Sequence, residues 1–143
     1  MKFSDFDSVS WEEHRGFYDT CLIPFTGLKG SESPVETVAA LERLRDFMDI
    51  IEKPFRGRIV TYPVLQYGGE HSLKLINELC CNVKSKNFRY AIVLTADIDI
   101  SESKIIESDL VLSLPHFREL TSKEVQAFTA EKIQELWLKG VPL

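Results

Sequence analysis

The stretch that decides the fold spans residues 90–95 and consists of Tyr90-Ala91-Ile92-Val93-Leu94-Thr95. It carries no charge and is rich in β-branched residues, as expected of a strand that is covered on both faces of a sheet. Two other stretches share this pattern: Ile59-Val60-Thr61-Tyr62-Pro63-Val64-Leu65 and Leu110-Val111-Leu112-Ser113-Leu114. Strands buried on both faces are typical of parallel sheets, because the segments that join parallel strands lie against the faces.

Helix signals alternate with these strands. A hydroxyl residue followed three positions later by glutamate predicts a capping box at three helix starts: Ser10 with Glu13, Ser33 with Glu36, and Thr121 with Glu124. The second start is the best marked, because Pro34 suits the first helical position. The apolar stripe of this helix ends before Pro54. Another helix runs through about Lys84, and the last one stops at Gly140 and Pro142.

A further strand is expected over residues 20–25. It contains Pro24, which cannot donate a backbone hydrogen bond and therefore indicates a strand end or an edge strand. The segment from Ala96 to Asp109 barely exceeds the minimum length of a parallel crossover. We expect one turn of helix at residues 103–106 and a parallel pair; extension of a strand through Ile98 and Ile100 would instead make this pair antiparallel.

The order of these elements predicts the fold class. We expect a Rossmann-like α/β protein, a three-layer sandwich with a small, mostly parallel sheet of about four strands flanked by helices. The length of 143 residues suits a single domain that covers residues 1–143.

Composition narrows the environment and the partners. The formal net charge of -5 opposes binding to nucleic acid, and no apolar stretch is long enough to span a membrane. The N-terminus lacks the apolar region of a secretory signal, so we expect a cytoplasmic protein. The three cysteines have no metal-binding spacing, and we expect reduced thiols, with Cys21 and Cys80 in the core.

Candidate site residues follow from the expected topology. Ligands of open α/β sheets bind beyond the carboxyl ends of the strands. The residues that lie in or just after the expected strands are Tyr62, Gly68, Gly69, Asp97, Asp99, His116 and Arg118. If the strands are parallel, these residues are neighbours at one edge, where an acidic pair beside a cation could bind a polar ligand and His116 could exchange protons.

Sharper interpretations of these motifs are incomplete. Asp97-Ile98-Asp99 at a strand end resembles the acid pair of haloacid-dehalogenase-like phosphatases, but it follows a late strand instead of the first. As a calcium loop it lacks the glycine and the closing glutamate. Gly68-Gly69 before a helix could hold an anion, yet no lysine of a phosphate loop follows. We therefore predict no metal site and no cofactor.

Two family resemblances can be stated. The chain contains Tyr18-Asp19-Thr20 before Leu22-Ile23-Pro24, followed by a helix and Ile59-Val60-Thr61-Tyr62-Pro63. In this order of segments it resembles the uncharacterised YpiF-like family of Bacillus-type bacteria. This resemblance implies a bacterial cytosolic protein and supplies no catalytic residue. Residues 108–114 are similar to a late strand of nucleoside deoxyribosyltransferase-like domains, whose glutamate nucleophile has no counterpart here that can be placed.

No motif completes a catalytic site, so the sequence does not decide whether the protein is an enzyme. We expect a non-catalytic cytosolic accessory or protein-interaction domain. The alternative is a small enzyme or binding domain that acts on a nucleotide or another phosphorylated metabolite at the carboxyl edge of the sheet. An unknown protein partner and a homo-oligomer are both compatible with the composition.

Overall fold

The computed structural model describes residues 1–140, and Pro142 lies outside this part of the chain. The helices and strands follow in the order α1 (Ser8–His14), β1 (Thr20–Leu28), α2 (Pro34–Glu52), β2 (Ile59–Thr61), β3 (Leu65–Tyr67), α3 (Ser72–Val83), β4 (Tyr90–Thr95), β5 (Leu110–Ser113) and α4 (Ser122–Lys139). Short 3-10 helices include η4 (Glu102–Lys104) and η5 (Leu114–Phe117).

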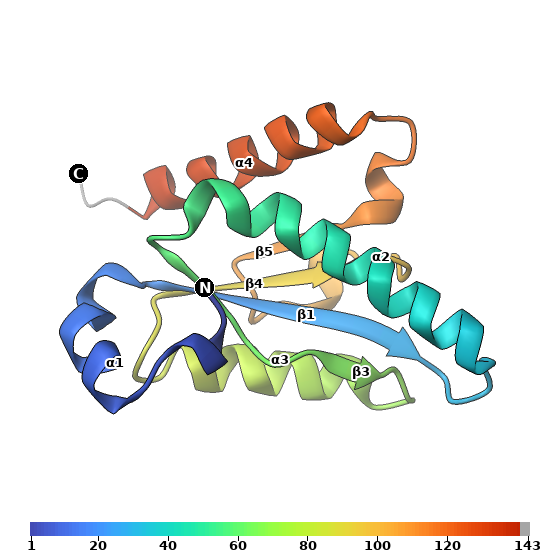
Figure 1. The fold of residues 1–143 in the computed structure, drawn as a ribbon, viewed down its shortest axis with the longest axis horizontal. Helices are drawn as coiled ribbons and strands as arrows, with labels where there is room; N and C mark the ends of the chain where they lie inside the picture. Colours follow the sequence, from blue (N-terminus) through green and yellow to red (C-terminus); the bar gives the residue numbers. More distant parts are fainter. Residues whose placement is uncertain (141–143) are drawn as a thin grey trace.

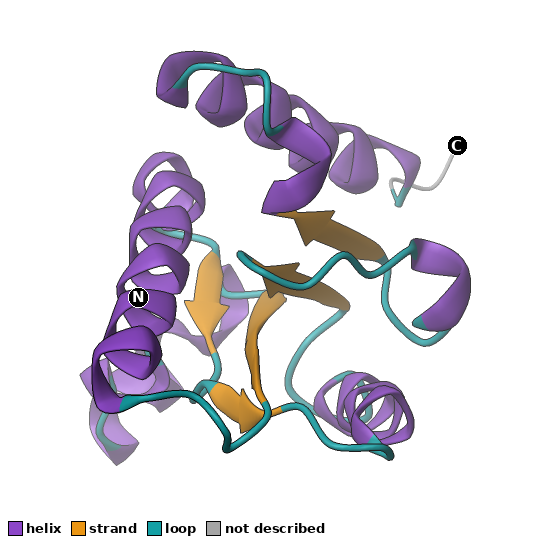
Figure 2. Cartoon of the chain, turned by 90° about the vertical axis from the view of Figure 1, so that its right-hand side faces the viewer, coloured by secondary structure: helices purple, strands orange, loops and turns teal. Residues whose placement is uncertain are grey.

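A five-stranded parallel sheet forms the middle layer, in the order β2-β1-β4-β5, with β3 also paired to β1. Helices α2 and α4 lie over one face, and α1 and α3 lie over the other (Figure 1). Figure 2, seen from the carboxyl ends of the strands, shows the same three layers. The predicted α/β sandwich with a mostly parallel sheet is confirmed.

Strand β1 is the centre of the sheet, and the prediction that Pro24 marks an edge strand or a strand end is wrong. The strand pairs with β4 on one side and with β2 and β3 on the other. The carbonyl of Leu22 accepts a hydrogen bond from Tyr62 N at 2.8 Å, so the backbone N–H and C=O of Leu22 point toward β2. The backbone polar groups of residues two apart point to the same neighbouring strand, so the nitrogen of Pro24 points toward the gap between β2 and β3. The missing N–H therefore costs little.

The expected strand over residues 59–65 is divided. It breaks after Thr61 and resumes at Leu65, and both pieces pair with β1. Pro63 lies in the break and has no N–H to donate. The second piece extends to Tyr67, two residues beyond the expected end.

Two of the three predicted capping boxes are confirmed. Ser33 Oγ accepts from Glu36 N at 3.1 Å, and Thr121 Oγ1 accepts from Glu124 N at 3.2 Å. The prediction of a cap at Ser10 is wrong, because α1 starts at Ser8 and Asp7 is its cap. Asp7 Oδ1 accepts from Ser10 N at 2.8 Å, which places Ser10 inside the helix. Aspartate caps as well as serine does, so the local pattern offered two starts.

The crossover between β4 and β5 contains only the 3-10 helix η4. Four residue pairs, from Ile92 with Leu110 to Thr95 with Ser113, show that the two strands are parallel. The prediction of a parallel pair is therefore confirmed. Ile98 and Ile100 extend no strand.

The side chains of the sheet form two cores, one on each face. The core under α2 and α4 contains Leu22, Phe47, Ile92 and Trp137. The indole N–H of Trp137 donates to Thr20 Oγ1 at 2.9 Å and so fixes the end of α4 against β1. The core on the α3 side is built from the alternate residues of the same strands and also contains Ile76 and Cys80 from α3.

The cap of α2 provides a test of this architecture. Ser33→Ala removes the acceptor for Glu36 N, and we expect a loss of about 1 kcal/mol in the free energy of unfolding, measured by urea denaturation. Ser31→Ala is the matched control, because Ser31 is exposed in the same loop. Equal stability of the two variants would contradict this cap assignment.

Candidate functional site

The carboxyl ends of the strands contain a topological switch point. From β1 the chain crosses through α2 to β2, and from β3 it crosses through α3 to β4 on the opposite side of β1. The loops after β1 and β4 therefore diverge, which is where open α/β sheets place their ligands.

Three adjacent cavities follow this edge. The switch-point cavity, of about 400 Å³, lies between the ends of β1 and β4 and the first half of α2. The helix groove, of about 680 Å³, lies between α2 and the start of α4. The β5 groove, of about 710 Å³, follows β5 beneath α4. Neighbouring cavities share lining residues: Arg43 and Asp97 line the first two, and Phe117 and Arg118 line the last two.

Asp97 forms a two-point ion pair with Arg43 of α2. The guanidinium donates from Nε and Nη2 to the two carboxylate oxygens, each at 2.8 Å. This hydrogen bonding raises the pKa of Arg43 above its ordinary value. The pair fixes the loop after β4 to α2 and separates the switch-point cavity from the helix groove. The sequence indicated Asp97 as a site residue but not Arg43, because nothing in the helix pattern distinguishes Arg43 from the neighbouring charged residues.

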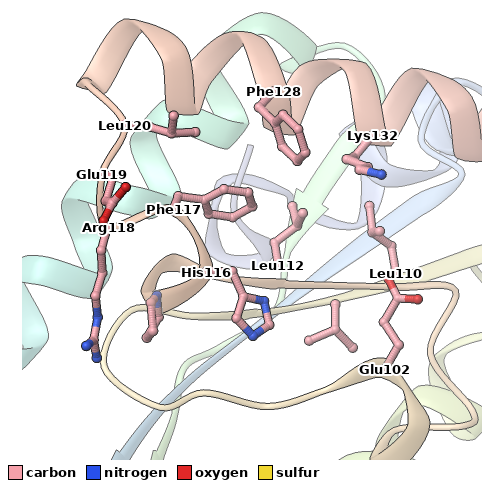
Figure 3. A pocket seen from close by; sticks show the side chains of 12 residues that line it. Glu102, Leu110, Leu112, His116, Phe117, Arg118, Glu119, Leu120, Phe128 and Lys132 are labelled. Carbon is pink, nitrogen blue, oxygen red and sulfur yellow. The ribbon is translucent and has the colours of Figure 1, made fainter.

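His116 and Asp99 also lie together, as predicted. His116 Nε2 contacts Asp99 Oδ1, which joins the loop after β5 to the loop after β4. Both side chains are largely exposed. Arg118 lines the helix groove and the β5 groove, and in Figure 3 its guanidinium points away from Phe117. Four predicted residues, Asp97, Asp99, His116 and Arg118, thus lie around the same edge.

Tyr62 does not join this group. Tyr62 packs edge-on against Phe3, with 5.0 Å between ring centroids, in the core on the α3 side. The expectation that Tyr62 lies beside Asp97 and His116 is therefore wrong, because the break after β2 directs its side chain to that core.

Gly68 serves close packing. A Cβ on Gly68 would lie 2.7 Å from the Cα of Gly27, so only glycine permits this approach. The neighbouring Gly69 follows in the turn before α3, and its carbonyl accepts from Ser72 N at 3.1 Å. We therefore assign this glycine pair to a turn.

The loop after β1 has the form of an anion site whose amides are already occupied. Glu32 accepts hydrogen bonds from Lys29 N at 2.9 Å and from Gly30 N at 2.8 Å, and these bonds lower its pKa. At the start of α2, the Glu36 carboxylate accepts from Ser33 N at 3.1 Å. Carboxylates of the chain itself thus occupy amides that could hold an anion at this edge.

Thr26 is an unsatisfied group beneath the same loop. Thr26 is 4% exposed, and its hydroxyl has no hydrogen-bond partner among the described residues. Thr26 lines the switch-point cavity, and the alternation from Leu22 directs it to the α2 face. A buried hydroxyl without a partner costs about 1–3 kcal/mol, so this residue needs a functional or structural reason. Its position at a strand end is visible in the sequence, but only the tertiary structure shows that its hydroxyl lacks a partner.

The floor of the β5 groove is an open strand edge. The N–H of Ala91 donates to Asp109 Oδ2, and the C=O of Ala91 accepts from Asp109 N, each at 2.8 Å. The backbone polar groups of Ala91, and those of Val93 two residues later, therefore point toward β5. Val93 is in register with Val111. In a parallel pair a residue bonds to the two neighbours of its partner, so the N–H and C=O of Val111 face the groove. Among residues 1–140, β5 pairs with β4 alone.

Side chains of both signs surround this edge. Phe128 and Lys132 descend from α4 on one wall, and Glu102 of η4 lies opposite (Figure 3). Phe128 is 40% exposed, a large fraction for an aromatic ring beside a core. Its exposure identifies this wall as an apolar contact point.

The cysteines take no part in this edge. Cys21 and Cys80 are buried, and burial raises the pKa of Cys21 to about 12 and of Cys80 to about 11. Their thiols stay protonated near neutral pH. Cys81 of α3 is exposed on the opposite face of the sheet.

Residues 1–140 contain neither a metal-binding cluster nor a membrane-spanning helix. In that part of the chain, no three His, Cys, Asp or Glu side chains are grouped so that they could hold a metal ion. None of the described helices is long and apolar enough to cross a membrane.

The fold and this edge define a parallel α/β domain with a grooved carboxyl end. Residues 9–138 match the family described as "Protein of unknown function (DUF2487)". This match covers most of the chain, and the protein belongs to that family. No curated protein and no solved structure matches the chain. The YpiF-like name and the Bacillus-type origin stay predictions.

Two buried threonines of β1 allow a comparison of satisfied and unsatisfied hydroxyls. Thr20→Val leaves the indole N–H of Trp137 without an acceptor, and we expect a loss of about 1–3 kcal/mol in unfolding free energy. Thr26→Val removes a hydroxyl that has no partner, and we expect unchanged or increased stability in the same urea titration. A larger loss from Thr26→Val than from Thr20→Val would contradict the assignment.

The Glu32 contacts predict an acid-sensitive loop. A carboxylate with a lowered folded-state pKa contributes stability above its unfolded pKa, and this contribution is lost as pH falls through the folded value. We expect carbon NMR of labelled protein to give Glu32 a pKa below 4.5, the ordinary value for this group. Glu32→Gln should remove this signal and so confirm its assignment. A Glu32 pKa at or above 4.5 would show that the amides are not engaged in solution.

Proposed function

We propose that this protein is a non-catalytic protein-interaction domain that binds an extended segment of a partner protein along β5. The open edge of β5 at the floor of a groove carries this proposal. An extended segment adds to such an edge through main-chain hydrogen bonds, while its alternate side chains contact the two walls. The outward N–H and C=O of Val111 supply the first of these bonds.

The walls indicate the chemistry of the segment. Side chains of the bound segment that point toward α4 meet Phe128 and Lys132, which favour an apolar and an acidic residue in the segment. Side chains that face η4 meet Glu102, which favours a basic residue. The Phe128 ring can bury further area on binding, as the aromatic anchors of protein interfaces do.

A single strand suits the groove better than a second copy of this chain. Two-fold pairing of β5 with β5 brings the same wall of each copy together, so two α4 helices with their Lys132 side chains would lie on one side. An extended segment has no helices of its own that must fit between the walls. An extended segment of a partner protein is therefore the occupant that we propose.

The binding test uses a labelled ten-residue peptide, in which valine and aspartate alternate on one face and lysine and threonine on the other. Fluorescence anisotropy should show saturable binding, and Phe128→Ala should weaken it at least tenfold, about 1.4 kcal/mol. Leu138→Ala is the matched control, because Leu138 is an exposed apolar residue farther along α4. Its affinity should equal that of the original protein.

Three further outcomes separate the alternatives. Two peptides, each N-methylated at one of the two alternate sets of amides, should behave differently. One should lose binding and the other should keep it, because only one set of amides points toward β5. Equal affinity of the Phe128→Ala and Leu138→Ala proteins would contradict the proposal. A dimer that sedimentation detects and that Phe128→Ala dissociates would replace the partner by a second copy.

A further inference from the structure

We propose that the switch-point cavity is a second binding site, for a small uncharged molecule that carries hydroxyl groups, a sugar or a nucleoside. This site is independent of the β5 groove. It lies where the loops after β1 and β4 diverge, which is the usual ligand position in open α/β sheets.

The cavity exists because small residues line it. Ala39 and Ala40 of α2 face the end of β1, where Gly27 contributes no side chain. The resulting space of about 400 Å³ is large enough for a small metabolite. Val35 and Ile98 add apolar surface against which the carbon face of a sugar ring or a base can pack.

The hydroxyl of Thr26 is the observation that points to a ligand. It is buried beneath the cavity and, among the described residues, it has no partner. A hydroxyl both donates and accepts a hydrogen bond, so it suits the hydroxyl of a ligand. Rotation about the Cα–Cβ bond of Thr26 can direct its hydroxyl toward a ligand in the cavity.

The Arg43–Asp97 pair supplies further polar groups at the rim. Arg43 uses Nε and Nη2 in this pair, so Nη1 can still donate. The oxygens of Asp97 each have another lone pair with which to accept. A carboxylate and a guanidinium held side by side can bind two adjacent hydroxyls at once.

Charge disfavours a phosphorylated ligand in this cavity. Its lining contains two cationic side chains, Lys29 and Arg43, and three carboxylates, Glu32, Glu36 and Asp97. Glu32 already occupies the amides of Lys29 and Gly30 that would otherwise hold an anion. A phosphate would have to displace this carboxylate and then lie between the other two.

The test compares ribose, adenosine and adenosine monophosphate by calorimetry on the whole protein. We expect saturable binding of ribose, adenosine or both, and at least tenfold weaker binding of the monophosphate than of adenosine. Binding of ribose and adenosine alike would identify the sugar as the recognised group, and binding of adenosine alone would identify a nucleoside. Equal or tighter binding of the monophosphate would overturn the proposal, and so would the absence of binding by all three probes.

Variants locate the site. Ala39→Leu fills the cavity and should abolish binding, whereas Ala127→Leu, at an exposed alanine of α4, should bind as the original protein does. Thr26→Val should bind at least fivefold more weakly while its thermal midpoint stays the same or rises. Unchanged affinity of both Ala39→Leu and Thr26→Val would place the ligand elsewhere and refute the assignment.

Discussion

The whole sheet depends on the two-sided pairing of β1. This strand holds β4 on one side and two short strands on the other, so each remaining strand except β5 is placed by direct hydrogen bonds to it. A proline lies in its middle, and pairing survives because the pyrrolidine nitrogen faces the gap between β2 and β3. The last residues of the same strand, from Thr26 to Leu28, line the switch-point cavity, so the register that builds the sheet also builds this cavity.

Local signals in the sequence predicted most of the fold. Charge-free β-branched stretches identified β4 and β5, and hydroxyl-to-glutamate spacing identified the starts of α2 and α4, because each signal acts within a few residues. The position of Pro24 was predicted wrongly for the opposite reason. Whether a proline is tolerated depends on what lies beside its nitrogen, and here that is a gap formed by a segment almost 40 residues later in the chain.

The candidate site was predictable only where strand ends define it. Asp97, Asp99, His116 and Arg118 follow β4 and β5 directly, so parallel topology was enough to bring them to one edge. Arg43 comes from the side of a helix, where its role depends on the carboxylate that it meets. Tyr62 was misplaced because the chain leaves the sheet at that residue, so its side chain joins the core on the α3 side.

The contrast among the three thiols has a practical consequence. Near neutral pH the two buried thiols stay protonated and shielded, so an alkylating fluorophore or a spin label should attach to the exposed Cys81. Because α3 covers the face opposite α2 and α4, a probe there lies on the other side of the sheet from those two helices (Figure 1). The unmodified sequence therefore already provides a single reporter position for spectroscopy, without a cysteine having to be removed or introduced.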